Sequence, residues 1–196
     1  MFFSLCGIPG VGKTAVKQYV LELALDAGLN IQDAHRHRIL YELAGVSSKL
    51  QYIQLPLTTR RKANIALVDR LYALEVNDPN GIRLRDDHFV SPYSDGSYFM
   101  RPLHSMDYFY LAGILILTAD PSTIITRRIG DGLALRHDHA NDTLATATAH
   151  QFLEMSTACQ QAAILGIPFR VIENTSGAVE DAAREVLHFI RKPQAI

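Results

Sequence analysis

The residues best suited to chemistry form a glycine-rich segment near the N-terminus, Gly7–Thr14, with the sequence GIPGVGKT. The segment satisfies the pattern G-x4-GK[ST], and it lies between a short apolar run and a stretch with helical periodicity, which is the context the pattern requires. Glycines let backbone N–H groups turn inward around a phosphate, and the following helix N-terminus adds partial positive charge. Lys13 would reach the β and γ phosphates, and Thr14 would hold Mg²⁺. The segment predicts a site for ATP or GTP with magnesium.

Two adjacent carboxylates, Asp86 and Asp87, are the candidates for the second magnesium ligand. They end a strand predicted within residues 81–88, and such sites place a carboxylate at the end of a parallel strand. Arg83 and Arg85 alternate with apolar residues in this strand, which puts Asp87 on their polar face and favours it over Asp86. Arginines inside a buried strand are unusual, so a solvated acidic turn is the alternative interpretation.

Three arginines near a long predicted helix, Arg127, Arg128 and Arg136, form a further candidate group. Phosphoryl transfer spreads negative charge over the moving group, so a kinase acting alone must supply its own cations on a closing segment. Closure would also exclude water. Residues 129–142 are polar and lack periodicity, which predicts a mobile loop. The alternative for each arginine is an exposed basic residue at a helix end, where the helix dipole favours it.

Length and composition limit the class of protein. The 196 residues, with 48% hydrophobic and 20% charged side chains, predict one globular domain, residues 1–196. A net charge of −1 gives no basis for nonspecific binding to nucleic acid or to acidic lipid. Only five of the 19 basic residues are lysines, and arginine suits a small polyanionic ligand. The two cysteines, Cys6 and Cys159, are expected to be buried, which indicates a reducing, cytoplasmic location. The longest apolar run, residues 111–117, is too short to span a bilayer.

Strands alternate with helices along the chain. This order predicts an α/β fold in which right-handed crossovers give a mostly parallel sheet covered by helices on both faces. Strands are expected at 2–6, within 81–88, at 112–119 and at 169–172; helices are expected at 13–27, 32–44, 59–74, from 121 onward, at 143–165 and at 179–190.

With these residues in place, the chain resembles the archaeal-type adenylate kinases, a branch of the P-loop nucleoside monophosphate kinases. Beyond the first motif, the resemblance is carried by residues 87–88, 91–92 and 96–98, by residues 120–128, and by residues 150–152. It implies a three-layer P-loop kinase fold whose five-stranded parallel sheet has the order 2-3-1-4-5. It also implies an acceptor-binding arm at about residues 30–75 and a short lid at residues 129–142.

The resemblance implies a phosphotransferase that moves the γ-phosphoryl group of ATP to a nucleoside monophosphate, most simply AMP, with Mg²⁺. The resemblance implies that the catalytic residues are Lys13, Arg127, Arg128 and Arg136. The residues that it implies around ATP are Gly7, Pro9, Gly10, Val11, Gly12, Lys13, Thr14 and Ala15, with Glu173, Asn174 and Thr175 near the adenine. The implied magnesium ligands are Thr14, Asp87 and Asp86, and the residues implied at the acceptor are Arg60, Arg61 and His88.

Two other functions are compatible with the sequence. Residues 130–135 carry fewer charges than the family's lid, and residues 30–57 match the family weakly. One alternative is a P-loop kinase for another small acceptor. The other is an ATPase switch or assembly factor that acts through a protein or RNA partner, although the near-neutral charge argues against RNA.

Overall fold

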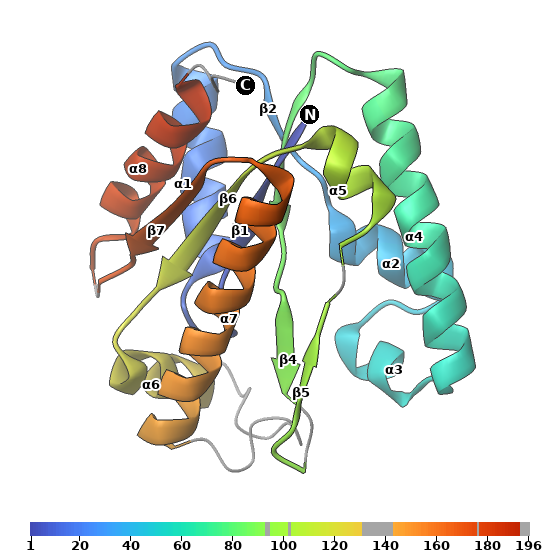
Figure 1. The fold of residues 1–196 in the computed structure, drawn as a ribbon, viewed down its shortest axis with the longest axis vertical. Helices are drawn as coiled ribbons and strands as arrows, with labels where there is room; N and C mark the ends of the chain where they lie inside the picture. The colour runs from blue at the N-terminus through green and yellow to red at the C-terminus, as the bar shows by residue number, and fades with distance from the viewer. Residues whose placement is uncertain (93–94, 102, 131–142, 176, 193–196) are drawn as a thin grey trace.

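The core of the protein is a parallel sheet of five strands. A computed structural model describes residues 1–92, 95–101, 103–130, 143–175 and 177–192. The sheet strands are β1 (Phe2–Cys6), β2 (Ile31–Asp33), β3 (Ile82–Asp86), β6 (Leu111–Thr118) and β7 (Phe169–Glu173). They lie in the order β2-β3-β1-β6-β7 (Figure 1). Counted among themselves, this is the order 2-3-1-4-5, so the predicted fold class is confirmed.

Helices cover both faces of the sheet (Figure 1). One face packs against α1 (Lys13–Asp26) and α8 (Val179–Arg191), and the other packs against α2 (Arg36–Ala44), α4 (Leu57–Asn77) and α7 (Leu144–Leu165). The remaining helices are α3 (Lys49–Gln54), α5 (Ser105–Tyr110) and α6 (Pro121–Gly130). None of the helices in the described ranges is both long enough and apolar enough to cross a membrane.

Strand alternation assigns side chains to the two faces. In β1, Phe3 and Leu5 join the core under α1 and α8, whereas Phe2 and Cys6 join the core under α4 and α7. This is the two-residue period expected of a strand that is buried on both sides. The end of β1, directly before Gly7, is therefore held by core packing on both faces.

The structure corrects the predicted helix at residues 32–44. Its first residues belong instead to β2, where Ile31 pairs with Ile82 and is buried. The carboxylate of Asp33 then accepts a hydrogen bond from the backbone N–H of His35 at 2.9 Å, and His35 adopts a left-handed backbone conformation with φ of 47°. This local turn ends the strand and delays the helix to Arg36.

Two further features differ from the sequence prediction. A hairpin of β4 (Val90–Pro92) and β5 (Tyr98–Met100) follows β3 and was not predicted. Cys6 is buried as expected, but Cys159 is exposed, so that expectation is wrong for the second thiol. Ala158 lies on the buried face of α7, and successive side chains on a helix point about 100° apart. The side chain of Cys159, the next residue, therefore points away from that face.

Candidate active site

The loop between β1 and α1 has a backbone conformation that requires glycine. Gly7, Gly10 and Gly12 have φ values of 141°, 90° and 91°, in the left-handed region that L side chains rarely adopt. A Cβ atom at Gly7 would lie 2.6 Å from the carbonyl oxygen of Leu117, and one at Gly12 would collide with the side-chain amide of Asn174. The sequence motif therefore corresponds to a tightly wound loop that only these glycines allow.

Side chains from distant segments hold the carbonyl groups of this loop. Asn174 donates from Nδ2 to the carbonyl of Val11 at 2.7 Å, and Arg128 donates from Nε to the carbonyl of Pro9 at 2.8 Å. Arg127 donates from Nη1 to the Val11 carbonyl at 3.3 Å. These hydrogen bonds fix the carbonyls of Pro9 and Val11, which favours a loop conformation in which neighbouring N–H groups such as those of Gly10 and Gly12 can face an anion.

The loop opens into a cleft of about 480 Å³, within the size range of small-ligand sites. Lys13 donates from Nζ to the carbonyl of Gly7 at 2.5 Å, which keeps its ammonium group beside the loop. The cleft is lined by Pro9, Gly10, Gly12, Lys13, Thr14, Ala15, His37, Lys49, Asp86, His88, Arg127, Asn174 and Val179. Most of the residues predicted around ATP thus share one cavity.

The two candidate acidic residues have different surroundings. Asp86 lines the cleft with Thr14, and no ion pair to it occurs among the described residues. Asp87 is fully buried and pairs with Arg36 at 2.6 Å and with Arg101 at 3.6 Å. Burial alone would raise the pKa of Asp87, but the guanidinium groups of Arg101 and Arg36 outweigh burial and hold that pKa well below its ordinary value. Asp87 is thus an ionised internal counter-charge.

Arg127 and Arg128 also differ in whether they line the cleft or are buried behind it. Arg127 lines the cleft, whereas Arg128 is 1% exposed and lies beneath the loop. Arg136 and most of the predicted lid, residues 131–142, lie outside the described residues. Glu173, the last residue of β7, and Thr175 are exposed, while Asn174 between them lines the cleft.

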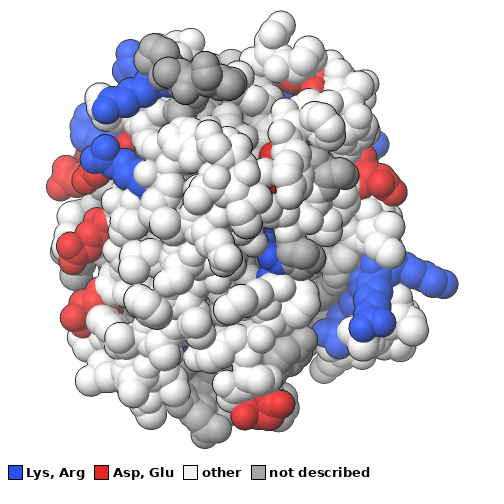
Figure 2. Space-filling model, viewed as in Figure 1, with Lys and Arg blue, Asp and Glu red and all other residues white. Residues whose placement is uncertain are grey.

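A second cleft of about 430 Å³ adjoins the first. It is formed largely by α2, α3 and the N-terminal part of α4, and Figure 2 shows Lys and Arg side chains gathered on the side formed by α3 and α4. Arg60, Arg61 and His88 all line it, so the three residues predicted at the acceptor lie together. The two clefts share His37, Lys49 and His88 in their walls.

His88 is a neutral group at the boundary between the clefts. Burial and the nearby ammonium group of Lys13 lower the pKa of His88 to about 3. At neutral pH its imidazole therefore carries no charge, and it can both donate and accept a hydrogen bond. The permanent positive charge of this boundary comes from Lys49, and Arg36, Arg60 and Arg61 add positive charge farther into the second cleft.

Glu154 on α7 joins the two halves of the site, and sequence reasoning missed it. Its carboxylate accepts hydrogen bonds from the backbone N–H groups of Gly7 at 3.3 Å, Phe89 at 2.9 Å and Val90 at 2.7 Å. Burial raises the pKa of Glu154 to about 7, although the donors from Phe89 and Val90 oppose that rise. A signal existed, because Glu154 lies four residues before buried Ala158 on the apolar stripe of α7.

Arg36 and Arg101 were also missed. Arg36 lines the acceptor-side cleft, and both arginines depend on Asp87, which lies 51 residues along the chain from Arg36. Such long-range pairs leave no local spacing in a sequence.

Comparison with known proteins supports the assignment built from this geometry. The chain is 28% identical to the adenylate kinase of Saccharolobus solfataricus over 188 residues, covering 93% of the chain and 95% of that relative. It is 27% identical to the adenylate kinase of Methanopyrus kandleri, with 94% and 95% covered, and 21% identical to that of Methanococcus vannielii with the same coverage. No protein-family model matches the chain. The fold, the glycine-rich loop and these full-length similarities together support a phosphotransferase of the adenylate kinase type.

Proposed function

We propose that this protein transfers the γ-phosphoryl group of ATP to a nucleoside monophosphate. The observation that carries the proposal is the shared wall of the two clefts, made by His37, Lys49 and His88. A donor bound by the glycine-rich loop and an acceptor bound among the arginines of α4 would meet at this wall. AMP is the first acceptor to test, since the relatives are named adenylate kinases.

The proposed donor site assigns a role to each side chain of the first cleft. The loop N–H groups and Lys13 bind the β and γ phosphates, while Arg127 approaches from α6 to offset charge that develops during transfer. Asn174 keeps the loop in its phosphate-binding conformation through Val11. Glu173 and Thr175 would flank the adenine, and Arg128 supports the loop from behind.

A magnesium ion fits the oxygen ligands of this cleft. The Thr14 hydroxyl and the Asp86 carboxylate both line it, and Mg²⁺ is typically held by one or two such oxygens with substrate phosphates and water. When bound, the ion would neutralise charge on the transferring phosphates. Asp87 would act indirectly, by keeping Arg36 in the wall of the acceptor cleft.

The proposed acceptor site uses charge to hold and orient a monophosphate. Arg36, Arg60 and Arg61 can grip phosphate oxygens with paired N–H donors. Neutral His88 can accept or donate a hydrogen bond beside the attacking oxygen. On this proposal residues 30–75 form the acceptor arm of a single kinase domain, and residues 129–142, with Arg136, form its lid.

The proposal is tested by incubating the protein with Mg²⁺, ATP and each of the common nucleoside monophosphates, and by measuring the nucleoside diphosphates formed. An acceptor-free reaction is the control. We expect ATP consumption to depend on the acceptor, with AMP among the substrates. ATP hydrolysis that is equally fast without any acceptor would contradict the proposal and favour an ATPase switch.

A further inference from the structure

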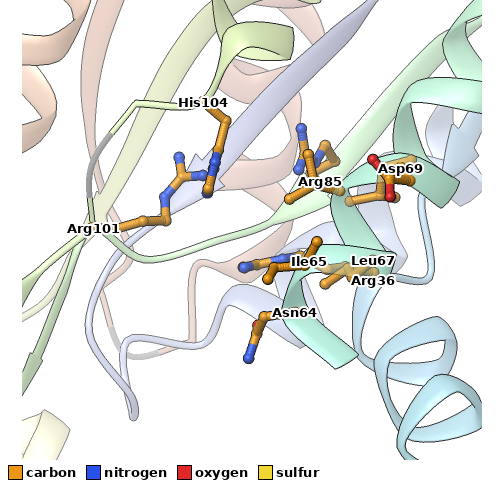
Figure 3. Close-up of a pocket in the computed structure, with 10 residues that line it drawn as sticks. Arg36, Asn64, Ile65, Leu67, Asp69, Arg85, Arg101 and His104 are labelled. Carbon is orange, nitrogen blue, oxygen red and sulfur yellow. The ribbon is translucent and has the colours of Figure 1, made fainter. Parts of the chain in front are cut away.

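A third cavity, which we call the arginine cavity, lies beside the acceptor cleft (Figure 3). It has a volume of about 230 Å³ and lies between α4, β3 and the segment that follows β5. Apolar side chains of α4 form much of its wall, and Arg36, Arg85, Arg101 and His104 also line it. The cavity shares Arg36 and Asn64 with the acceptor cleft, so the two are neighbours with a common wall.

The buried charges around the arginine cavity do not balance. Arg36 pairs with Asp87 at 2.6 Å, and Arg101 lies 3.6 Å from Asp87 and 3.7 Å from Asp107. The two buried carboxylates, Asp87 and Asp107, therefore balance the charges of two arginines, Arg36 and Arg101. Arg85 is the third guanidinium group, and no carboxylate within the described ranges forms an ion pair with it. A surplus positive charge results.

Arg85 is buried without the partners that a guanidinium group needs. It is 3% exposed, its guanidinium group lies 3.9 Å from the centre of the Phe2 ring, and its Nε and Nη1 atoms have no hydrogen-bond partner. Burial lowers the pKa of Arg85 to about 10; the carboxylates of Asp87 and Asp107 oppose that lowering, while the charges of Arg36 and Arg101 add to it. An unsatisfied buried charge of this kind is costly to the folded state.

Arg83, on the same strand and the same face, shows that the fold can pair a buried arginine. Its guanidinium group binds Glu75 at 3.1 Å and Asp78 at 2.8 Å. The lack of a partner at Arg85 is thus a feature of its cavity, and unsatisfied charges beside cavities are characteristic of ligand sites.

We propose that the arginine cavity binds an acidic group, with Arg85 as its counter-ion, and that this group is carried by the far end of the acceptor molecule. The second part rests on the proposed function. The shared wall with the acceptor cleft supports it, and so does the volume, which suits a ring or a small group but falls below the range for whole ligands. The carboxylate of Asp69, an exposed residue that also lines the cavity, opposes any acid bound there, and the guanidinium groups of Arg36, Arg85 and Arg101 outnumber it.

Substitution with methionine separates a ligand-binding arginine from a structural one. We expect Arg85→Met to keep or raise the melting temperature, because it removes an unpaired buried charge. The matched control, Arg83→Met, should lower the melting temperature because it removes the buried cation that pairs with both Glu75 and Asp78. A large loss of stability for Arg85→Met, equal to that for Arg83→Met, would show that Arg85 is structural and would overturn the proposal.

Ligand binding is followed by NMR, with the Nε–H signal of Arg85 assigned by comparison with Arg85→Met. The probes are UMP, its 5-carboxy derivative and inorganic phosphate. We expect the carboxy derivative to shift the Arg85 signal and to bind at least about tenfold more tightly than UMP, as one charge-assisted hydrogen bond allows. That preference should disappear in Arg85→Met.

The other outcomes are distinct. A saturable Arg85 shift with inorganic phosphate alone would support the anion site but overturn its assignment to the acceptor. No Arg85 shift with either acid would overturn the site itself. The amide signals of Gly10 and Gly12, titrated with ATP and Mg²⁺ in the same sample, report on the proposed function separately.

Discussion

The two faces of the central sheet are built from different kinds of residue. Toward α1 and α8, β1 and β3 present apolar side chains such as Phe3 and Leu84. Toward α4 and α7, β3 presents Arg83 and Arg85, and α7 contributes the buried carboxylate of Glu154. The sheet therefore has an apolar core on one side, and on the other side an apolar core that also contains a network of buried charges.

This difference separates stability from function. Apolar burial contributes about 25 cal/mol per Å² wherever it occurs, so the first face can hold the fold without specific partners. Buried charges cost free energy unless each is matched, and they are retained where their chemistry is needed. The glycine-rich loop lies where the two faces meet, and Glu154 ties it to the charged side through Gly7.

The largest expected effect is the loss of activity on changing Lys13 to alanine. Removing the ammonium group that would contact the transferring phosphate should lower kcat on the order of 10³-fold, as measured by nucleoside diphosphate formation. The matched control is Lys17→Ala on the same helix, which breaks a pair with Asp33 at 2.8 Å but does not line the cleft. Comparable activity losses in both variants would contradict a specific role for Lys13.

The two adjacent aspartates should respond in opposite ways. Asp87→Asn should lower the free energy of unfolding by about 3–5 kcal/mol, because Arg36 and Arg101 lose their buried counter-charge. Asp86→Asn should leave stability nearly unchanged and weaken magnesium-dependent activity. Urea unfolding and a magnesium titration of activity measure these effects, and a stable Asp87→Asn protein would show that the charged face does not depend on this carboxylate.

Glu154 should make stability depend on pH. Its pKa is near 7 in the folded state against an ordinary value of 4.5, so the folded protein keeps a proton that the unfolded chain has lost. Its stabilising contribution is complete below pH 4.5 and disappears as the pH rises through 7. Between pH 5 and pH 8 the free energy of unfolding should fall by about 2.5 kcal/mol from this group.

The control for that measurement is Glu154→Gln, which cannot titrate. The variant should be less stable than the wild type at pH 5, because its amide cannot accept all the N–H donors that the carboxyl group meets. The difference between the two proteins should then shrink as the pH rises. A difference that stays constant from pH 5 to pH 8 would mean that Glu154 is already ionised throughout.

The smallest effects concern the two cysteines. Burial raises the pKa of the Cys6 thiol well above its ordinary value, whereas Cys159 is exposed. Iodoacetamide should therefore alkylate Cys159 in the folded protein and reach Cys6 only after unfolding, as mass spectrometry of the peptides would show. Cys159→Ser should change the free energy of unfolding by less than about 0.5 kcal/mol. Rapid alkylation of Cys6 would indicate that the charged face opens to solvent.

Much of the fold could be predicted because its signals are local. Long apolar runs identified β1 and β6, and apolar residues at helical spacing identified α1 and α8. The three-residue strands β2, β4 and β5 are too short to show a period, so they were absorbed into a helix or a loop.

The candidate site likewise contains a part with a local sequence signal and a part without one. The glycine-rich loop is one continuous motif, and its spacing is sufficient to predict it. Strand alternation also placed Asp87 correctly with Arg83 and Arg85, but only the packing shows that this face is covered by α4 and α7 while Asp86 reaches the cleft. The partners of Glu154 lie at least 64 residues away in the chain, and no sequence pattern records them.

The junction of the donor and acceptor clefts is tested most directly with diadenosine pentaphosphate, which carries an adenosine at each end and can occupy both at once. Calorimetry should give one ligand per chain, an affinity at least about 10²-fold tighter than that of ATP, and loss of AMP binding in its presence. An affinity equal to that of ATP, with AMP still able to bind, would contradict two adjoining sites.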